Sequence, residues 1–166
     1  TLDLANEQIY ALSPTADMGV VLVSNAQLSP YHSSIVKLDA NGNVEWRKTA
    51  SQVTAQGVAF FCITPTNDFG FLIGGTLHPQ GGGSSGAYYL KIDANGNQLW
   101  SKLYRGGSND VRRILQLDDG GFLSVGSSTA VRLDKVGSLL WSMWIDGGPF
   151  SDVIKTANGH ILLVAG

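Results

Sequence analysis

The chain has 166 residues, of which 43% are hydrophobic and 14% charged, as in an ordinary globular domain. Its formal net charge is −2 and its 11 Lys and Arg residues are scattered, so nucleic acid is not an expected partner. No apolar stretch approaches the roughly 18 residues of a membrane helix. The composition therefore predicts a folded domain without membrane insertion.

Glycine and cysteine content narrows the fold class further. The chain contains 21 glycines and few long polar tracts, which favours many short strands joined by tight turns. Its single cysteine, Cys62, lies in the apolar run 58–63. An internal disulfide is thus excluded, and the thiol is expected to be buried.

The first repeat unit is predicted over residues 7–49 as four antiparallel strands. Strands are predicted near 9–12, 19–25, 33–38 and 43–49. The last two segments flank Asn41-Gly42, and an Asn-Gly pair between alternating segments is a strong hairpin signal. Two hairpins in succession are the pattern of a four-stranded sheet.

The later units repeat this order. Strands are predicted near 57–64, 69–76, 87–92 and 97–104 in a unit over 57–104, and near 110–116, 121–126, 129–133 and 138–145 in a unit over 110–145. An incomplete unit over 151–166 has two predicted strands, near 151–156 and 159–165. Boundary errors of about two to four residues are expected.

The same motif recurs in register along the chain. Residues 35–46 return as 89–100 and as 130–141, which makes three sets equivalent: Asp39, Asp93 and Asp134; Gly42, Gly96 and Gly137; Trp46, Trp100 and Trp141. Four antiparallel strands per unit predict an all-β fold, a β-propeller of three four-stranded blades plus a half blade. No segment keeps a helical period for ten residues without Gly or Pro, which excludes a helical solenoid, and a β-sandwich would not explain the repeat.

At Lys37-Leu38-Asp39, followed by Gly42, Asn43 and Trp46, the chain resembles the delta-60-type propeller repeats of bacterial secreted and surface proteins. Further elements of that repeat match residues 106–110 and 119–122. The resemblance implies a propeller and a secreted, periplasmic or cell-surface location, but these repeats occur in proteins of many roles.

A more distant resemblance is to pyrroloquinoline-quinone-type propellers. It implies that Trp46, Trp100 and Trp141 dock between neighbouring blades. The cofactor does not carry over, because its calcium and polar ligand set cannot be placed in this sequence. No cofactor is therefore predicted.

Several motifs could be interpreted as ligand, metal or catalytic sites, but each also has a structural interpretation. Asp39, Asn41 and Asn43 alternate as in a calcium loop, but the later ligands are missing, so hairpin turns are favoured and no metal site is predicted. The three repeated tryptophans could form a sugar-binding stripe, but their recurrence favours packing. The Gly-rich segment 81–86 lacks a phosphate-binding Lys-Ser/Thr. The three histidines have no metal-ligand spacing, and no catalytic motif is present.

A ligand is expected on the face where the connections between blades emerge. These connections are residues 51–56, 106–109 and 147–151. The long loops 25–34 and 78–86 are expected on the same face. The predicted ligand-binding residues on this face are Asp110, Arg112, Asp152, Trp144 and His78. Asp110 and Asp152 would begin inner strands close to Arg112 and Arg113, although capping of a turn is the favoured interpretation of each Asp.

Two classes of function remain open. The favoured one is a non-catalytic binding or scaffolding module that engages a protein or a glycan through the loop face. The alternative is a fragment of a propeller enzyme, such as a glycan lyase, a hydrolase or a quinoprotein. Inward carboxylates or a metal at the mouth of the propeller's central channel would favour the enzyme. A channel mouth lined by small residues and backbone would favour the binding module.

Three and a half blades do not close a ring. An open array exposes sheet faces and an unpaired strand edge. We therefore expect the ring to be closed by the remainder of a longer propeller or by other copies of the chain.

Overall fold

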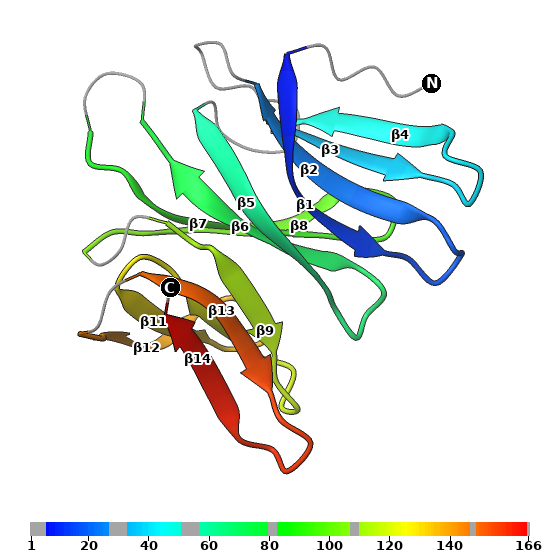
Figure 1. Cartoon of the computed structure of the whole chain (residues 1–166). Coiled ribbons are helices and arrows are strands. Elements are labelled where there is room, and N and C mark those ends of the chain that lie inside the picture. Colours follow the sequence, from blue (N-terminus) through cyan, green and yellow to red (C-terminus); the bar gives the residue numbers. More distant parts are fainter. Residues whose placement is uncertain are drawn as a thin grey trace.

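The computed structural model describes residues 6–26, 33–50, 57–79, 83–106, 110–146 and 149–165. Within these ranges the chain forms fourteen strands in four antiparallel sheets of four, four, four and two strands (Figure 1). This confirms the predicted all-β class, and the arrangement is propeller-like. In the described part of the chain, no helix is long and apolar enough to cross a membrane.

The strands follow the predicted order. The first sheet contains β1 (Glu7–Pro14), β2 (Val20–Ala26), β3 (Ser33–Leu38) and β4 (Val44–Thr49). The second contains β5 (Val58–Pro65), β6 (Phe71–Leu77), β7 (Gly86–Ile92) and β8 (Gln98–Tyr104). The third contains β9 (Arg113–Gln116), β10 (Phe122–Val125), β11 (Thr129–Leu133) and β12 (Leu139–Trp144), and the fourth β13 (Phe150–Lys155) and β14 (Ile161–Ala165).

One strand boundary differs more than the others from the prediction. Strand β9 begins at Arg113, whereas the alternation in sequence placed its start near residue 110. The reason is that Asp110 turns its carboxylate to Ser127, accepting hydrogen bonds from the backbone N–H at 2.9 Å and from the hydroxyl at 2.8 Å. This local bonding replaces strand pairing at Asp110.

Each four-stranded sheet is a meander in which neighbouring strands pair in sequence order. The first strands of successive sheets, β1, β5, β9 and β13, pack on one another. Figure 1 shows these four strands following one another through the middle of the molecule. We call them the inner strands.

Buried side chains fill the space between successive sheets in three clusters. The first cluster joins the first two sheets and includes Val21, Ile35, Phe60 and Leu90. The second joins the second and third sheets, and the third joins β13 to the third sheet. Successive side chains of a strand point to opposite faces, and all residues of β6 and β7 are buried, so the second sheet packs on the first with one face and on the third with the other.

Buried hydrogen bonds fix the sheets to one another. The Asn25 side chain donates to the Phe60 carbonyl at 2.7 Å and accepts from the Phe60 N–H at 2.9 Å. Between the next two sheets, Thr64 donates to the Ile114 carbonyl at 2.7 Å. Such bonds satisfy groups that would otherwise be buried without partners, which fixes the stacking of the sheets.

The repeated tryptophans pack on the turn of the following sheet. A Cβ added at Gly96 would lie 2.9 Å from Trp46, and one added at Gly137 would lie 2.7 Å from Trp100. Trp46 and Trp100 are accordingly half-buried. The expectation that all three tryptophans are mostly buried is wrong for Trp141, which is 44% exposed because no described turn covers it.

Candidate binding site on the inner strands

A β-bulge occurs at the same position in successive inner strands. In β1, Ile9 pairs with Ser24 and Ala11 with Val23, so Tyr10 is left without a partner. The same shift leaves Phe61 unpaired in β5 and Ser151 unpaired in β13. A bulge reorients the side chain of its extra residue.

The third sheet repeats this geometry at Arg112. Arg112 donates its backbone N–H to the Val125 carbonyl at 2.9 Å, while Arg113 is the register partner of Val125. Two residues therefore oppose one, as in a bulge. Tyr10, Phe61, Arg112 and Ser151 are thus structurally equivalent.

These four bulge residues converge on one pocket, which we call the inner pocket. Its volume is about 420 Å³, and Asp110 and Arg113 complete the lining. The Tyr10 and Phe61 rings lie 5.6 Å apart between centroids. The inner pocket therefore combines an aromatic wall with a charged one.

Paired charges form the charged wall. Arg112 Nε donates to Asp110 Oδ2 at 2.7 Å, and Arg113 Nε lies 3.6 Å from Asp152 Oδ1. Both guanidinium groups are about half exposed. Each guanidinium has five N–H donors, more than these contacts use, so both can also bind a carboxylate or hydroxyls of a ligand.

The structure brings together only some of the predicted ligand-binding residues. Asp110 and Arg112 line the inner pocket, and Asp152 is joined to it through Arg113. Trp144 lies instead on β12, the outermost strand of the third sheet, where it is 68% exposed. His78 lies after β6, with Nδ1 2.9 Å from the Ser85 hydroxyl.

Tyr10 and Phe61 were missed by the sequence interpretation, and Ser151 was included only as the end of the connection 147–151. The available signal was a break in alternation, since Phe60 and Phe61 are adjacent aromatic residues within a strand. In the structure Phe60 is fully buried and Phe61 only partly. Most of the connections predicted to carry ligand contacts, residues 27–32, 51–56, 80–82, 107–109 and 147–148, lie outside the described residues.

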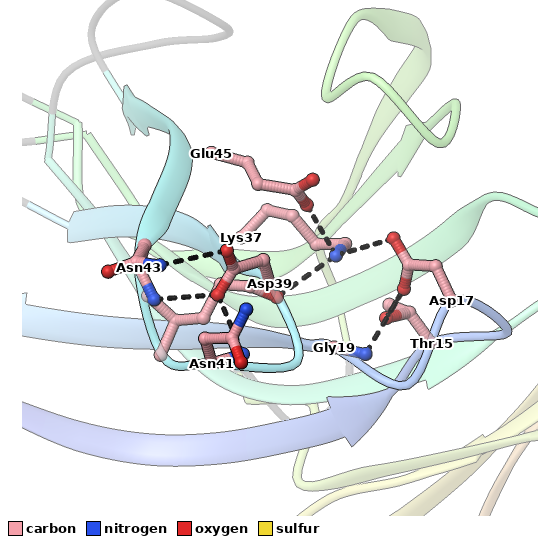
Figure 2. Close-up of polar contacts among 9 residues, drawn as sticks. Thr15, Asp17, Gly19, Lys37, Asp39, Asn41, Asn43 and Glu45 are labelled. Atoms are coloured by element: carbon pink, nitrogen blue, oxygen red, sulfur yellow. Dashed lines mark hydrogen bonds and ion pairs between the residues drawn. The ribbon is translucent and has the colours of Figure 1, made fainter.

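The Asp-containing turns of the repeat are held by their own hydrogen bonds (Figure 2). Asp39 Oδ1 accepts the backbone N–H groups of Asn41 and Asn43, each at 2.8 Å, and Asp93 and Asp134 repeat the pattern. The hydrogen bonds from Asn43 hold the pKa of Asp39 below its usual range. The turn chemistry favoured over calcium is therefore present in all three turns.

A second repeated contact joins the third strand of each four-stranded sheet to the turn between its first two strands. Lys37 Nζ donates to Asp17 Oδ2 at 2.8 Å, and Lys91 Nζ donates to Asp68 Oδ1 at 2.9 Å. Arg132 pairs with Asp119 in the third sheet. These residues recur in the sequence repeat itself, so their alignment was the signal that could have revealed the ion pairs.

Among the described residues, no group of three or more His, Cys, Asp or Glu side chains is placed to hold a metal ion.

Comparison with known proteins shows the fold and no family. No protein-family model matches the chain, and no curated protein matches its sequence. The structure is similar to a protein of unknown function from Bacteroides caccae, with a TM-score of 0.67 and 16% identity over 98% of this chain and 58% of that one. It is also similar to a gluconolactonase from Xanthomonas campestris, with a TM-score of 0.61 and 13% identity over 99% of this chain and 57% of that one.

At these identities the likeness shows a shared fold alone. The chain spans less than two thirds of the length of either solved protein.

Proposed function

We propose that the chain is a non-catalytic binding module of a secreted, periplasmic or cell-surface bacterial protein. In this proposal its four sheets are three blades and a half blade of a β-propeller, and it engages its ligand through the inner pocket. The observation that carries the proposal is the convergence of four equivalent bulge residues on that pocket. The location follows from the resemblance of the repeat.

Within the expected classes of ligand, the pocket favours a glycan with carboxylate groups over a protein. The aromatic rings of Tyr10 and Phe61 offer apolar surface for stacking on a sugar ring. Arg112 and Arg113 supply the planar donors that suit a carboxylate. A volume of about 420 Å³ accommodates one or two sugar units rather than a protein surface.

The proposal is tested by calorimetric titration of the chain with a galacturonic acid trisaccharide and with neutral maltotriose. We expect the acidic trisaccharide to bind at least about tenfold more tightly, since a charge-assisted bidentate contact contributes about 1.5–3 kcal/mol. Arg112→Gln should remove most of this difference. Arg105→Gln is the matched control, because Arg105 is exposed and does not line the pocket.

Equal binding of the two sugars, or no binding of either, would overturn the glycan proposal. Hydrolysis of an aldonolactone or a glycan by the chain, lost in Arg112→Gln and retained in Arg105→Gln, would instead support the propeller-enzyme alternative. The lining of the inner pocket matches neither the lining expected for an enzyme nor that expected for a binding module. It has one carboxylate, Asp110, together with two arginines and two aromatic residues.

We further propose that additional blades, from a longer chain or from other copies, cover the exposed apolar end of the array. Large exposed apolar side chains gather on β12 and β14: Leu139, Leu140, Trp141, Met143, Trp144, Ile161, Leu162 and Val164. The tryptophans of the first two sheets are covered by the next sheet, as Trp46 is by Gly96, whereas Trp141 is 44% exposed. Light scattering after size-exclusion chromatography tests this, and a stable monomer of 17.6 kDa with a cooperative melt would contradict it.

A further inference from the structure

A second cavity lies at the turn end of the sheets, between the first and second sheets. We call it the turn cleft. Its volume is about 440 Å³, and its lining includes Trp46, Phe69, Asp17, Glu45 and Asn95. It shares no lining residue with the inner pocket. The function proposed above therefore leaves it unexplained.

Phe69 occupies a backbone conformation that normally requires glycine. Its φ is 63°, close to the 65° of Met18 at the equivalent position of the first sheet, whereas the third and fourth sheets have Gly120 and Gly159 there, with φ of 79° and 85°. The same turn hydrogen bond, to the residue three positions earlier, is made in each case. A bulky residue with positive φ is strained, and strain of this kind gathers at functional sites.

Burial of the Phe69 ring does not offset this backbone strain, because the residue is 79% exposed. A glycine would satisfy the turn equally well and without the backbone cost. The aromatic ring is nevertheless presented at the mouth of a cavity that also contains Trp46. Two aromatic side chains on one cavity are a surface for an apolar or a cationic group.

The charges of the turn cleft sum to one negative charge. Lys37 is buried, and its Nζ donates to Asp17 at 2.8 Å, to Glu45 at 2.6 Å and to the Leu38 carbonyl at 3.0 Å (Figure 2). All three ammonium donors are thereby used. The two carboxylates share this one cation, and their side chains remain 55% and 44% exposed.

The neighbouring groove between the second and third sheets provides an internal contrast. At the position of Glu45 it has Leu99, and at the position of Phe69 it has Gly120. At the position of Ala94 it has Lys135, which makes that groove more positive. The combination of aromatic rings and excess negative charge therefore belongs to the first groove and is not a requirement of the fold.

We propose that the turn cleft binds an alkylammonium group. Cations are attracted to aromatic rings, and here Phe69 and Trp46 line the cleft together with the carboxylates of Asp17 and Glu45. Asp17 and Glu45 provide the counter-charge, of which Lys37 neutralises only half. A neutral ligand of the same shape would gain the apolar contact but not the electrostatic one.

Choline and its uncharged isostere 3,3-dimethylbutan-1-ol are the probes that separate these contributions. We expect choline to shift the indole NMR signal of Trp46 saturably, with an affinity at least about tenfold above that of the isostere. Glu45→Gln and Glu45→Leu should each weaken choline binding about tenfold. Phe69→Gly should weaken the binding of both probes.

The substitutions are chosen to keep the fold. Leu and Gly are the residues that the chain already has at the equivalent positions 99 and 120, and Glu45→Gln changes the charge alone. Arg112→Gln, in the inner pocket, should leave choline binding unchanged, so this test is independent of the glycan proposal. Equal affinity for choline and its isostere, no saturable shift, or unchanged binding in the Glu45 variants would overturn the proposal.

Discussion

The indole of Trp46 lies against Gly96, the left-handed glycine of the turn in the next sheet, where φ is 77°. Trp100 lies against Gly137 in the same manner. The side chain of one repeat thus depends on the absence of a side chain in the following one. This contact gives a reason for both the tryptophan and the turn glycine to recur in the repeat.

Gly96→Ala should destabilise the chain more than Gly42→Ala does. Both glycines have positive φ, so each substitution costs about 1–2 kcal/mol in backbone conformation. At Gly42 the added methyl group meets nothing within 4 Å, whereas at Gly96 it lies 2.9 Å from Trp46. Overpacking should add about 1–3 kcal/mol, measured as the difference in free energy of unfolding in urea. Equal losses in the two variants would show that the indole does not contact the turn.

The three repeated tryptophans should differ in their contributions to stability. Replacement of the half-buried Trp46 or Trp100 by Ala should cost about 2–4 kcal/mol, slightly below the range for fully buried aromatic residues. Trp141→Ala should cost less than about 1 kcal/mol, because that side chain is 44% exposed. Urea denaturation measures all three. A loss at Trp141 as large as that at Trp100 would indicate that another sheet covers it in solution.

Acid should destabilise the chain through its turn carboxylates. Hydrogen bonds lower the pKa of Asp39 and of Asp134 below the ordinary 3.8, so each contributes stability above that pH and loses it as the pH falls through the folded-state pKa. The free energy of unfolding should therefore decrease between about pH 5 and about pH 2. Asp39→Asn should reduce the steepness of this decrease. An unchanged pH profile in Asp39→Asn would contradict the assignment.

Phe69→Gly should stabilise the chain while it impairs the turn cleft. The strained φ is relieved, and little buried surface is lost because the ring is 79% exposed. Glycine adds conformational entropy to the unfolded state, so the net gain should be only about 0.5–1 kcal/mol, visible as a higher thermal midpoint. Met18→Gly, with φ of 65° at the equivalent position, is the matched control for the backbone effect. A lower thermal midpoint for Phe69→Gly would mean that the ring packs on the fold.

The sequence by itself determined the strands, their order and the hairpin turns. These features rest on contacts within a few residues. Asp39 bonds to Asn41 and Asn43, and alternation along each strand assigns its two faces. Because such contacts are short-range, the residues that make them recur in every repeat and can be recognised by comparing the chain with itself.

Only the tertiary structure decided which side chains meet across sheets. Tyr10 and Arg112 share a pocket because both occupy bulges, and a bulge is defined by counting residues against a partner strand. The same reason applies to Trp141, which matches Trp100 in sequence but lacks a described turn against it. Equivalent residues acquire different environments because the neighbouring sheet, and not the local motif, supplies the covering surface.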